Sequence, residues 1–167
     1  MLYAHRYASP LGGITMASDG RALTGLWFDG QRTMPKGLPA PSDDSTPEVF
    51  VEADQWLDRY FSGEIPGTPP ALSPQGSAFR QAVWALLMKI PYGETTTYGG
   101  LARALAAEKG LSRMSAQAVG GAVAHNPISI IIPCHRVLGA NGALTGYAGG
   151  LERKRWLLDL ESPRTRA

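Results

Sequence analysis

The chain has 167 residues with a formal net charge of +2, and its 44% hydrophobic and 18% charged content is typical of a globular protein rather than a disordered or fibrous one. It contains one cysteine, which excludes an internal disulfide and a cysteine-rich zinc site and suits a reducing compartment such as the cytoplasm. No apolar run has the length of a membrane span, and the N-terminus lacks a secretory pattern, so we expect a cytoplasmic protein that makes no membrane contact.

Short strands joined by tight turns are predicted for the first 30 residues. Segments 2–7, 14–17 and 23–28 are the candidate strands, and glycine-containing turn signals separate them. Such a pattern predicts a small antiparallel meander. His5, within the first strand, is interpreted as an ordinary strand residue rather than a ligand.

An exposed loop and one helix follow the meander. Residues 31–46 are rich in Pro, Gly, Ser and Asp, which predicts a loop. Thr46 and Pro47 then mark a helix start, and apolar residues at spacings of one, three and four predict an amphipathic helix to Phe61. The next segment, 64–76, holds four prolines and two glycines and is the best candidate for a linker.

The charge changes sign at this linker, where we place a domain boundary. Residues 1–76 carry 5 basic and 9 acidic side chains, a net charge of −4. Residues 77–167 carry 11 basic and 5 acidic side chains, a net charge of +6. An excess of this size suggests that the second domain meets a polyanion, although a chance imbalance of solvated side chains explains it equally well.

Helices dominate the second domain. Apolar spacing predicts helices near 79–88, 98–106 and 115–124, and the short glycine-containing turn before the third gives a helix-turn-helix pattern. Asn-Gly at 141–142 predicts a hairpin over residues 138–144, the wing of a winged helix-turn-helix, and a last helix is predicted over 151–160. The fold class is therefore α+β: a small N-terminal antiparallel sheet with a helix, then a helical winged helix-turn-helix domain.

The third of these helices consists almost entirely of small residues and contains two adjacent glycines, Gly120 and Gly121. Each glycine costs about 1 kcal/mol against alanine in a helix interior, and it is useful where another backbone approaches closely. The sequence leaves two partners open, another helix of the domain or a sugar-phosphate backbone.

The only cysteine lies in the stretch from Asn126 to Val137. Ile128 to Ile132 is predicted to be a buried strand that Pro133 ends, because proline lacks the N–H that a central strand requires. Cys134 is followed at once by a histidine and an arginine, groups able to form or stabilise a thiolate, the nucleophilic form of cysteine. We infer a nucleophilic cysteine held at the end of a rigid element.

Several motifs in a fixed order now identify a family resemblance. They are Ile90-Pro91-Tyr92-Gly93, Thr97-Tyr98, Ala118-Val119-Gly120, Asn126-Pro127, Pro133-Cys134-His135-Arg136-Val137, Tyr147-Ala148-Gly149-Gly150 and Leu157-Leu158 with Glu161. Together they resemble the O6-alkylguanine-DNA alkyltransferases over most of residues 77–161. The N-terminal domain resembles that family's ribonuclease H-like domain in length and element order only.

The resemblance implies DNA repair by direct reversal. The alkyl group of O6-alkylguanine, and possibly of O4-alkylthymine as a second substrate, moves in one step to Cys134, and the protein is consumed because a thioether is not readily reversed. In the family a cysteine, a histidine and a glutamate form a relay, here Cys134, His135 and Glu161, in which the histidine acts through a water. Asn126 is expected to brace the turn that carries the cysteine.

The resemblance also implies how DNA is bound. Double-stranded DNA is expected to present its minor groove to the small-residue helix, including Ala118 and Gly120, and the damaged base is expected to leave the stack. Tyr98 corresponds to the tyrosine that crowds the phosphate, and Tyr147, Ala148 and Gly149 belong to the loop over the guanine. Gln117 stands where many members carry an arginine that fills the gap. Arg136 is expected to hold the two domains or the active-site turn rather than to act in catalysis.

We expect a monomer that needs no cofactor or metal. Two alternatives remain: a damage-binding relative that performs no chemistry, and a winged-helix transcription regulator with an inert cysteine. The first of them lacks a reactive cysteine, whereas Cys134 is present. The second does not explain why Cys-His-Arg follows an apolar run, nor the glutamate after the last helix.

Overall fold

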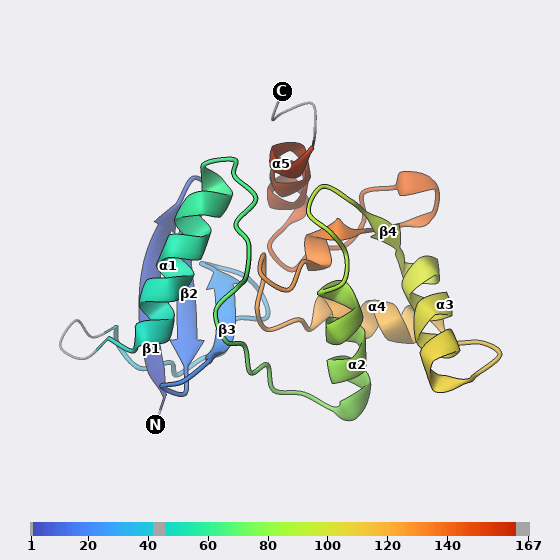
Figure 1. Cartoon of the computed structure of the whole chain (residues 1–167), viewed down its shortest axis with the longest axis horizontal. Helices are drawn as coiled ribbons and strands as arrows, with labels where there is room; N and C mark the ends of the chain where they lie inside the picture. The colour runs from blue at the N-terminus through green and yellow to red at the C-terminus, as the bar shows by residue number, and fades with distance from the viewer. Residues whose placement is uncertain (1, 42–45, 163–167) are drawn as a thin grey trace. The chain divides into compact units, whose positions relative to one another are not determined.

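The computed structural model describes residues 2–41 and 46–162 and divides the chain into two compact units (Figure 1). The N-terminal unit comprises residues 1–75 together with 127–129, and the C-terminal unit comprises 76–126 and 130–167. The predicted loop at 31–46 falls partly outside the described residues, because its residues 42–45 are not among them.

A three-stranded antiparallel sheet forms the base of the N-terminal unit. Its strands β1 (Tyr3–Ser9), β2 (Gly12–Ser18) and β3 (Leu23–Phe28) lie in sequence order, as the meander pattern predicted. Two short parallel bridges extend β3: Leu23 pairs with Leu72, and Leu26 pairs with Ile128. In the second bridge, Leu26 N donates to Pro127 O at 2.9 Å and Ser129 N donates to Leu26 O at 2.9 Å.

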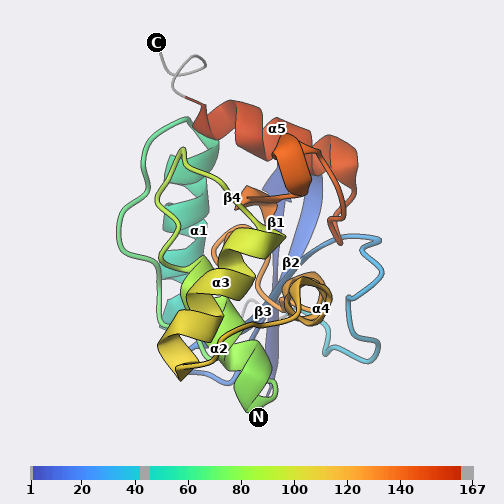
Figure 2. The same cartoon turned by 90° about the vertical axis from the view of Figure 1, so that its right-hand side faces the viewer.

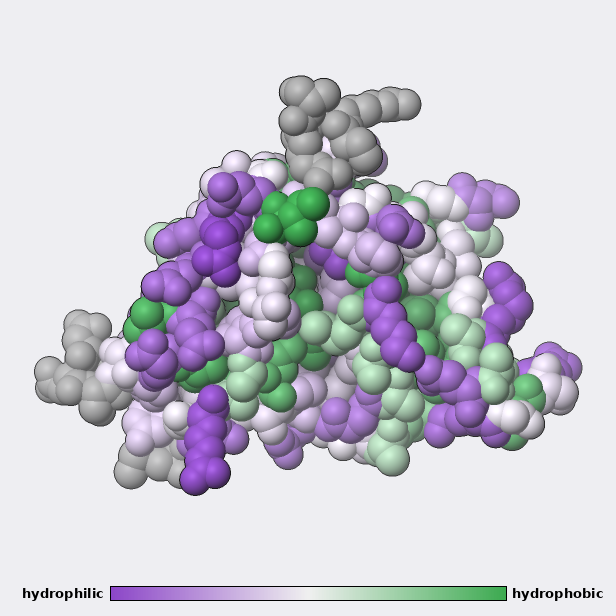
Figure 3. Space-filling view, viewed as in Figure 1, coloured by the Kyte–Doolittle hydropathy of each residue, from purple (hydrophilic) through white to green (hydrophobic). Residues whose placement is uncertain are grey.

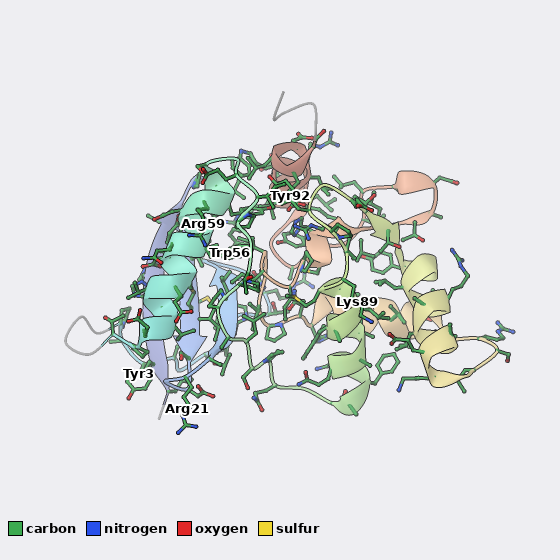
Figure 4. All side chains as sticks on the ribbon, viewed as in Figure 1. Tyr3, Arg21, Trp56, Arg59, Lys89 and Tyr92 are labelled. Carbon is green, nitrogen blue, oxygen red and sulfur yellow. The ribbon has the colours of Figure 1, made fainter. Side chains whose placement is uncertain are left out.

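One helix, α1 (Glu48–Phe61), packs against β1 and β2 (Figure 1). Its apolar stripe is buried, whereas its outer face is polar, which Figure 3 shows as purple over α1. Pro47 is its N-cap residue, so the helix starts at Glu48. Two α1 side chains labelled in Figure 4 hold the proline-rich segment: Trp56 Nε1 donates to Gly67 O at 3.3 Å and Arg59 Nε to Pro66 O at 3.2 Å.

The N-terminal unit has one glycine that its sheet requires. Gly25 and Trp27 lie two apart on β3, so their side chains share one face of the sheet. The Trp27 ring lies over Gly25 so closely that an added Cβ would be 1.9 Å from it. We expect Gly25→Ala to lower the unfolding free energy by about 1–3 kcal/mol, the usual cost of overpacking, because buried Trp27 must move.

Urea denaturation of the Gly25→Ala protein measures this cost. Gly30→Ala is a poor control because Gly30 has positive φ, whereas an exposed position such as Gln55 of α1 can be changed to alanine without a steric conflict. A Gly25→Ala protein as stable as the original would show that the Trp27 ring does not occupy this place in solution.

Three helices form the core of the C-terminal unit (Figures 1 and 2). They are α2 (Ala78–Leu87), α3 (Tyr98–Lys109) and α4 (Ala116–Ala124), each of which contacts the other two. The side chains of Ser77, Thr97 and Ser115 cap their N-termini by accepting a hydrogen bond from a backbone N–H. Trp84 of α2 donates its Nε1–H to Ala122 O at 2.9 Å and so fixes α2 against α4.

The turn between α3 and α4 follows from one glycine. Gly110 ends α3 in the left-handed conformation, with φ of 67°, which glycine adopts at no steric cost. The chain then reverses direction and α4 begins six residues later, at Ala116. This confirms the predicted helix-turn-helix pattern within an α+β fold. The last helix, α5 (Leu151–Glu161), contacts the segment that carries the cysteine.

Two local predictions are wrong. Residues 128–132 form turns with a single bridge rather than a strand, because Ile130 takes a positive φ of 70° that ends any extended run. The wing is not a two-stranded hairpin: Ala140–Gly142 forms a 3-10 turn, and Gly139 N donates to Ala143 O at 2.8 Å. The only strand beside it, β5 (Val137–Leu138), pairs instead with β4 (Thr96–Thr97) in parallel.

The described part of the chain contains no helix that is both long enough and apolar enough to span a membrane.

Candidate active site

The cysteine lies in a 3-10 turn, η1 (Cys134–Arg136), in which all three side chains are buried. An extended strand would have sent Cys134 and His135 to opposite faces. A 3-10 turn has three residues per turn, so consecutive side chains project about 120° apart and can surround a single group. This is why neighbouring residues of η1 can both reach one carboxylate.

The approach to η1 is held in an unusual backbone conformation. Ile130 is β-branched and buried, yet its φ is 70°, a region that costs such residues about 1–3 kcal/mol. Two hydrogen bonds fix the turn that follows: Asn126 Nδ2 donates to Ile132 O at 2.7 Å, and Cys134 N donates to the same oxygen at 2.8 Å. Asn126 is itself buried and thus lies where a brace for this turn was expected.

One carboxylate, Glu161 at the end of α5, collects both side chains that follow the cysteine. His135 Nε2 lies 2.5 Å from Glu161 Oε2, and Arg136 Nε donates to Oε1 at 2.7 Å. All three side chains are almost fully buried. Burial alone would raise the pKa of Glu161, but its hydrogen bonds and charge interactions with His135 and Arg136 outweigh burial and lower that pKa to about 2.

The ionised carboxylate fixes the tautomer of His135. Glu161 can only accept, so the proton of the neutral imidazole sits on Nε2 and Nδ1 carries the lone pair. His135 Nδ1 is buried and makes no hydrogen bond to any residue in the described ranges. Burial is the largest influence on the pKa of His135 and lowers it, so the ring is neutral at neutral pH. A neutral histidine held this way is able to accept a proton at Nδ1.

The thiol of Cys134 is 6% exposed and its pKa is raised, chiefly by burial. A hydrogen bond from Asn126 and the positive charge of Lys154 act in the opposite direction. The resting cysteine is therefore a thiol that needs a base to become a nucleophile. His135 is the adjacent group with a lone pair.

Lys154 is a site residue that the sequence analysis missed. It is fully buried in α5, and its Nζ donates to Val137 O at 2.6 Å, Thr145 O at 2.7 Å and Gly146 O at 3.1 Å. It thus connects the residue after η1 to the start of the predicted guanine loop. Its position in an amphipathic helix looks like that of any solvated lysine, so only the fold reveals it.

The residues predicted to handle the substrate lie on both sides of the turn. Tyr98, the first residue of α3, has its ring beside Gly120 and its hydroxyl beside Gly146, where an added Cβ would lie 3.6 Å and 3.5 Å away. The Tyr147 ring meets the His135 ring edge-on, with 6.5 Å between centroids. Tyr98, Tyr147 and His135 therefore lie in one region of the C-terminal unit.

The remaining predicted residues divide into two groups. Ala148 and Gly149 follow Tyr147 in the loop before α5, and Gly149 O accepts a hydrogen bond from Arg153 at 3.2 Å. Gln117 and Ala118 are exposed in the first turn of α4. Gln117 belongs to the outer face of this helix, and no printed contact joins it to the cysteine.

No group of three or more His, Cys, Asp or Glu side chains that could hold a metal occurs in residues 2–41 and 46–162. The chemistry of the site is therefore derived from the chain's own residues.

A buried thiol beside a neutral histidine, mounted on a helix-turn-helix unit, is the site of a DNA-binding protein that uses cysteine as a nucleophile. Two family models match the chain. The 6-O-methylguanine DNA methyltransferase DNA binding domain covers residues 78–163, and the ribonuclease-like domain of the same family covers residues 2–66. The chain belongs to the 6-O-methylguanine DNA methyltransferase family.

Individual relatives agree with the family models. A Haemophilus influenzae methylated-DNA–protein-cysteine methyltransferase is 44% identical over 161 residues, 96% of this chain and 86% of its own. The Mycobacterium tuberculosis O6-methylguanine methyltransferase crystal structure is 42% identical with a TM-score of 0.82, covering 100% of this chain and 95% of its own. The same protein has been solved in complex with DNA, with a TM-score of 0.82 and 99% and 96% coverage.

These findings confirm the predicted family, the α+β fold class and the class of activity, which is direct-reversal DNA repair by alkyl transfer to a protein cysteine. They also support DNA as the partner.

Proposed function

We propose that the protein repairs O6-alkylguanine in double-stranded DNA by moving the alkyl group to Cys134 in a single turnover. The carbon–oxygen bond at O6 breaks and a carbon–sulfur bond forms at Sγ, while the thiol proton passes towards His135 Nδ1 and the base returns to guanine. The observation that carries the proposal is the arrangement of a buried Cys134, a neutral His135 and Glu161 bonded to Nε2. The thioether has no nucleophile to reverse it, so the protein is spent.

Burial of the thiol requires the base to leave the stack. Cys134 is 6% exposed and lies in a turn, so its sulfur cannot enter a groove to reach a stacked base. We propose that the alkylated base rotates out between Tyr98 and the 145–149 loop, at a cost of a few kcal/mol. Tyr98 then crowds the phosphate, Tyr147 closes over the base, and Gln117 fills the gap left in the duplex. O4-alkylthymine is a second candidate substrate by the same chemistry.

The outer face of α4 supports a minor-groove interface. Gly120 has only ordinary contact with Tyr98, and an added Cβ at Gly121 would meet nothing within 4 Å, so packing inside the unit does not require glycine at either position. Of the two partners that the sequence left open, a DNA backbone therefore accounts better for the two glycines. We propose that a monomer docks this face, and residues 77–167 with their net charge of +6, onto DNA.

Replacing Gly121 tests this interface. Gly121→Ala is expected to raise the unfolding free energy by about 0.5–1 kcal/mol, because alanine is the better helix former and has space here. The same change is expected to weaken DNA binding, and Gly121→Leu to weaken it further, because the added side chain keeps the backbone away. Fluorescence anisotropy with a labelled duplex measures the affinity. Ala85→Leu, on an exposed position of α2, is the matched control. Unchanged affinity in Gly121→Leu would place the DNA elsewhere.

The experiment that tests the proposed function is intact-mass analysis. The protein is incubated with an equimolar duplex containing one O6-methylguanine, and we expect each protein molecule to gain the mass of one methylene group, since a methyl replaces the thiol proton. Excess damaged duplex should add nothing more. Binding of the damaged duplex without any mass change would identify a damage-binding protein instead. A duplex with O4-methylthymine tests the second substrate in the same way.

A further inference from the structure

Arg136 is buried and held on three sides. Its Nε donates to Glu161 Oε1 at 2.7 Å, its Nη1 donates to Ile90 O at 2.8 Å, and its guanidinium carbon lies 5.8 Å from the centre of the Tyr92 ring. Tyr92, labelled in Figure 4, belongs to the turn between α2 and β4. Only 8% of Arg136 is exposed. A guanidinium fixed by a carboxylate, a carbonyl and a ring face has one orientation, and all these contacts lie within the C-terminal unit.

Glu161 is shared between two neighbours in the sequence. Arg136 takes Oε1 and His135 takes Oε2, so neither side chain competes for the other's oxygen. The backbone N–H of Gly93 adds a longer contact to Oε1 at 3.4 Å. The side of the carboxylate facing Arg136 therefore carries the charge pairing, while the other side supplies one acceptor for the imidazole N–H.

The charges of this buried group balance only when Arg136 is present. With Glu161 ionised, Arg136 protonated and His135 neutral, the three side chains sum to zero. An unpaired charge in the interior is costly, so a buried carboxylate without Arg136 would recruit another proton. The nearest acceptor for that proton is His135, which would become an imidazolium paired with Glu161 and could no longer accept a proton from Cys134.

We propose that Arg136 is a positioning residue of the relay: by neutralising Glu161 it keeps His135 uncharged, with Nδ1 reserved for the proton of Cys134. This assignment rests on the proposed function for the identity of the reaction, but the protonation state of His135 can be measured without DNA. It differs from the role expected from the sequence, in which Arg136 only held domains or a turn.

Every charged or titratable group around His135 is accounted for. Burial lowers the pKa of His135; Glu161 of α5 raises it; Arg136 of η1 and then Lys154 of α5 lower it. Cys134 adjoins it in η1, and the Tyr147 ring meets it edge-on. Removing Arg136 leaves the raising influence of Glu161 less opposed, so the pKa of His135 must move up. The pH below which the relay fails moves up with it.

The test compares the full-length protein with Arg136→Gln and Arg136→Lys. The titration of His135 is followed by NMR on protein with isotope-labelled histidine, and the rate of methyl transfer is measured in single turnovers across pH. We expect the acid limb of the rate and the His135 titration to rise together by at least one pH unit in Arg136→Gln, a tenfold lower rate on that limb for each unit. Arg136→Lys keeps the charge and should return both towards the original values.

Controls separate charge from folding. Lys89→Gln removes one positive charge from an exposed ion pair with Glu108, and it should leave the His135 titration unchanged. If Arg136→Gln does not fold, Arg136→Met fills the volume without the charge and should show the same rise. A uniform loss of rate with an unshifted acid limb and an unshifted His135 titration would overturn the proposal. If the original protein transfers no methyl group, the proposed function fails, yet the His135 titration still tests Arg136.

Discussion

Replacing Cys134 with serine is expected to abolish methyl transfer while leaving the affinity for damaged DNA within about threefold. Serine is similar in size, so the 6%-exposed site should close as before. A hydroxyl is a far weaker acid than a thiol, and His135 cannot activate it for attack on an alkyl carbon in the same way. Intact-mass analysis after incubation with an O6-methylguanine duplex measures transfer, and fluorescence anisotropy with the same duplex measures binding.

The comparison of transfer with binding makes this variant informative. Loss of both in Cys134→Ser would mean that the cysteine is a structural residue mistaken for a nucleophile. Thermal unfolding of the variant should resemble that of the original protein, because one buried sulfur is exchanged for one oxygen in an otherwise unchanged turn.

Glu161→Gln is expected to cost both stability and activity. The amide leaves Arg136 buried without a counter-charge, and breaking a buried pair in this way typically costs about 3–5 kcal/mol. Glutamine can also offer its NH₂ to His135 and so disturb the tautomer that places the lone pair on Nδ1. Loss of a positioned general base lowers rates by about 10²–10⁴, and single-turnover methyl transfer measures it.

The stability difference between the original protein and Glu161→Gln should depend on pH. The pKa of Glu161 is about 2 in the folded protein, against a reference value of 4.5. A lowered folded pKa contributes stability above the unfolded value, and this contribution is lost as pH falls from 4.5 towards 2. The shift corresponds to about 3 kcal/mol. Urea denaturation should therefore show the two proteins converging across this range, and a constant difference would contradict the ion-pair assignment.

The sequence predicted the helix-turn-helix unit well because local signals specify it. Ser77, Thr97 and Ser115 are cap residues, and Gly110 is suited to the left-handed end of α3. The antiparallel meander was also readable, because turn residues separate its apolar segments. These features depend on neighbours along the chain, so periodicity and capping rules can detect them.

The central segment was mispredicted because tertiary contacts override its local preference. Five residues of high β propensity, 128–132, read as a strand. In the folded chain, Ile128 makes one bridge to Leu26, and Ile130 is held at positive φ, which no sequence rule anticipates for isoleucine. The resulting 3-10 turn is what lets His135 and Arg136 share Glu161.

The relay itself was only partly visible from the sequence. The family resemblance placed Cys134, His135 and Glu161 together, but the partner of Arg136 and the burial of Lys154 emerge from long-range contacts alone. An arginine beside a histidine and a lysine in a surface-type helix carry no local signal of burial. Gln117 remains a prediction: it is exposed at the start of α4, and its effect on base extrusion awaits a Gln117→Arg comparison.

The central claim is that Cys134 accepts the alkyl group, and peptide mass spectrometry tests it most directly. The protein is incubated with an equimolar duplex that carries an isotopically labelled methyl group on one O6-methylguanine, then digested and sequenced by fragmentation. The account predicts a labelled methyl on Cys134, at close to one per protein, with unmodified guanine left in the DNA. A label on any other residue, or labelled DNA recovered intact beside unmodified protein, would contradict it.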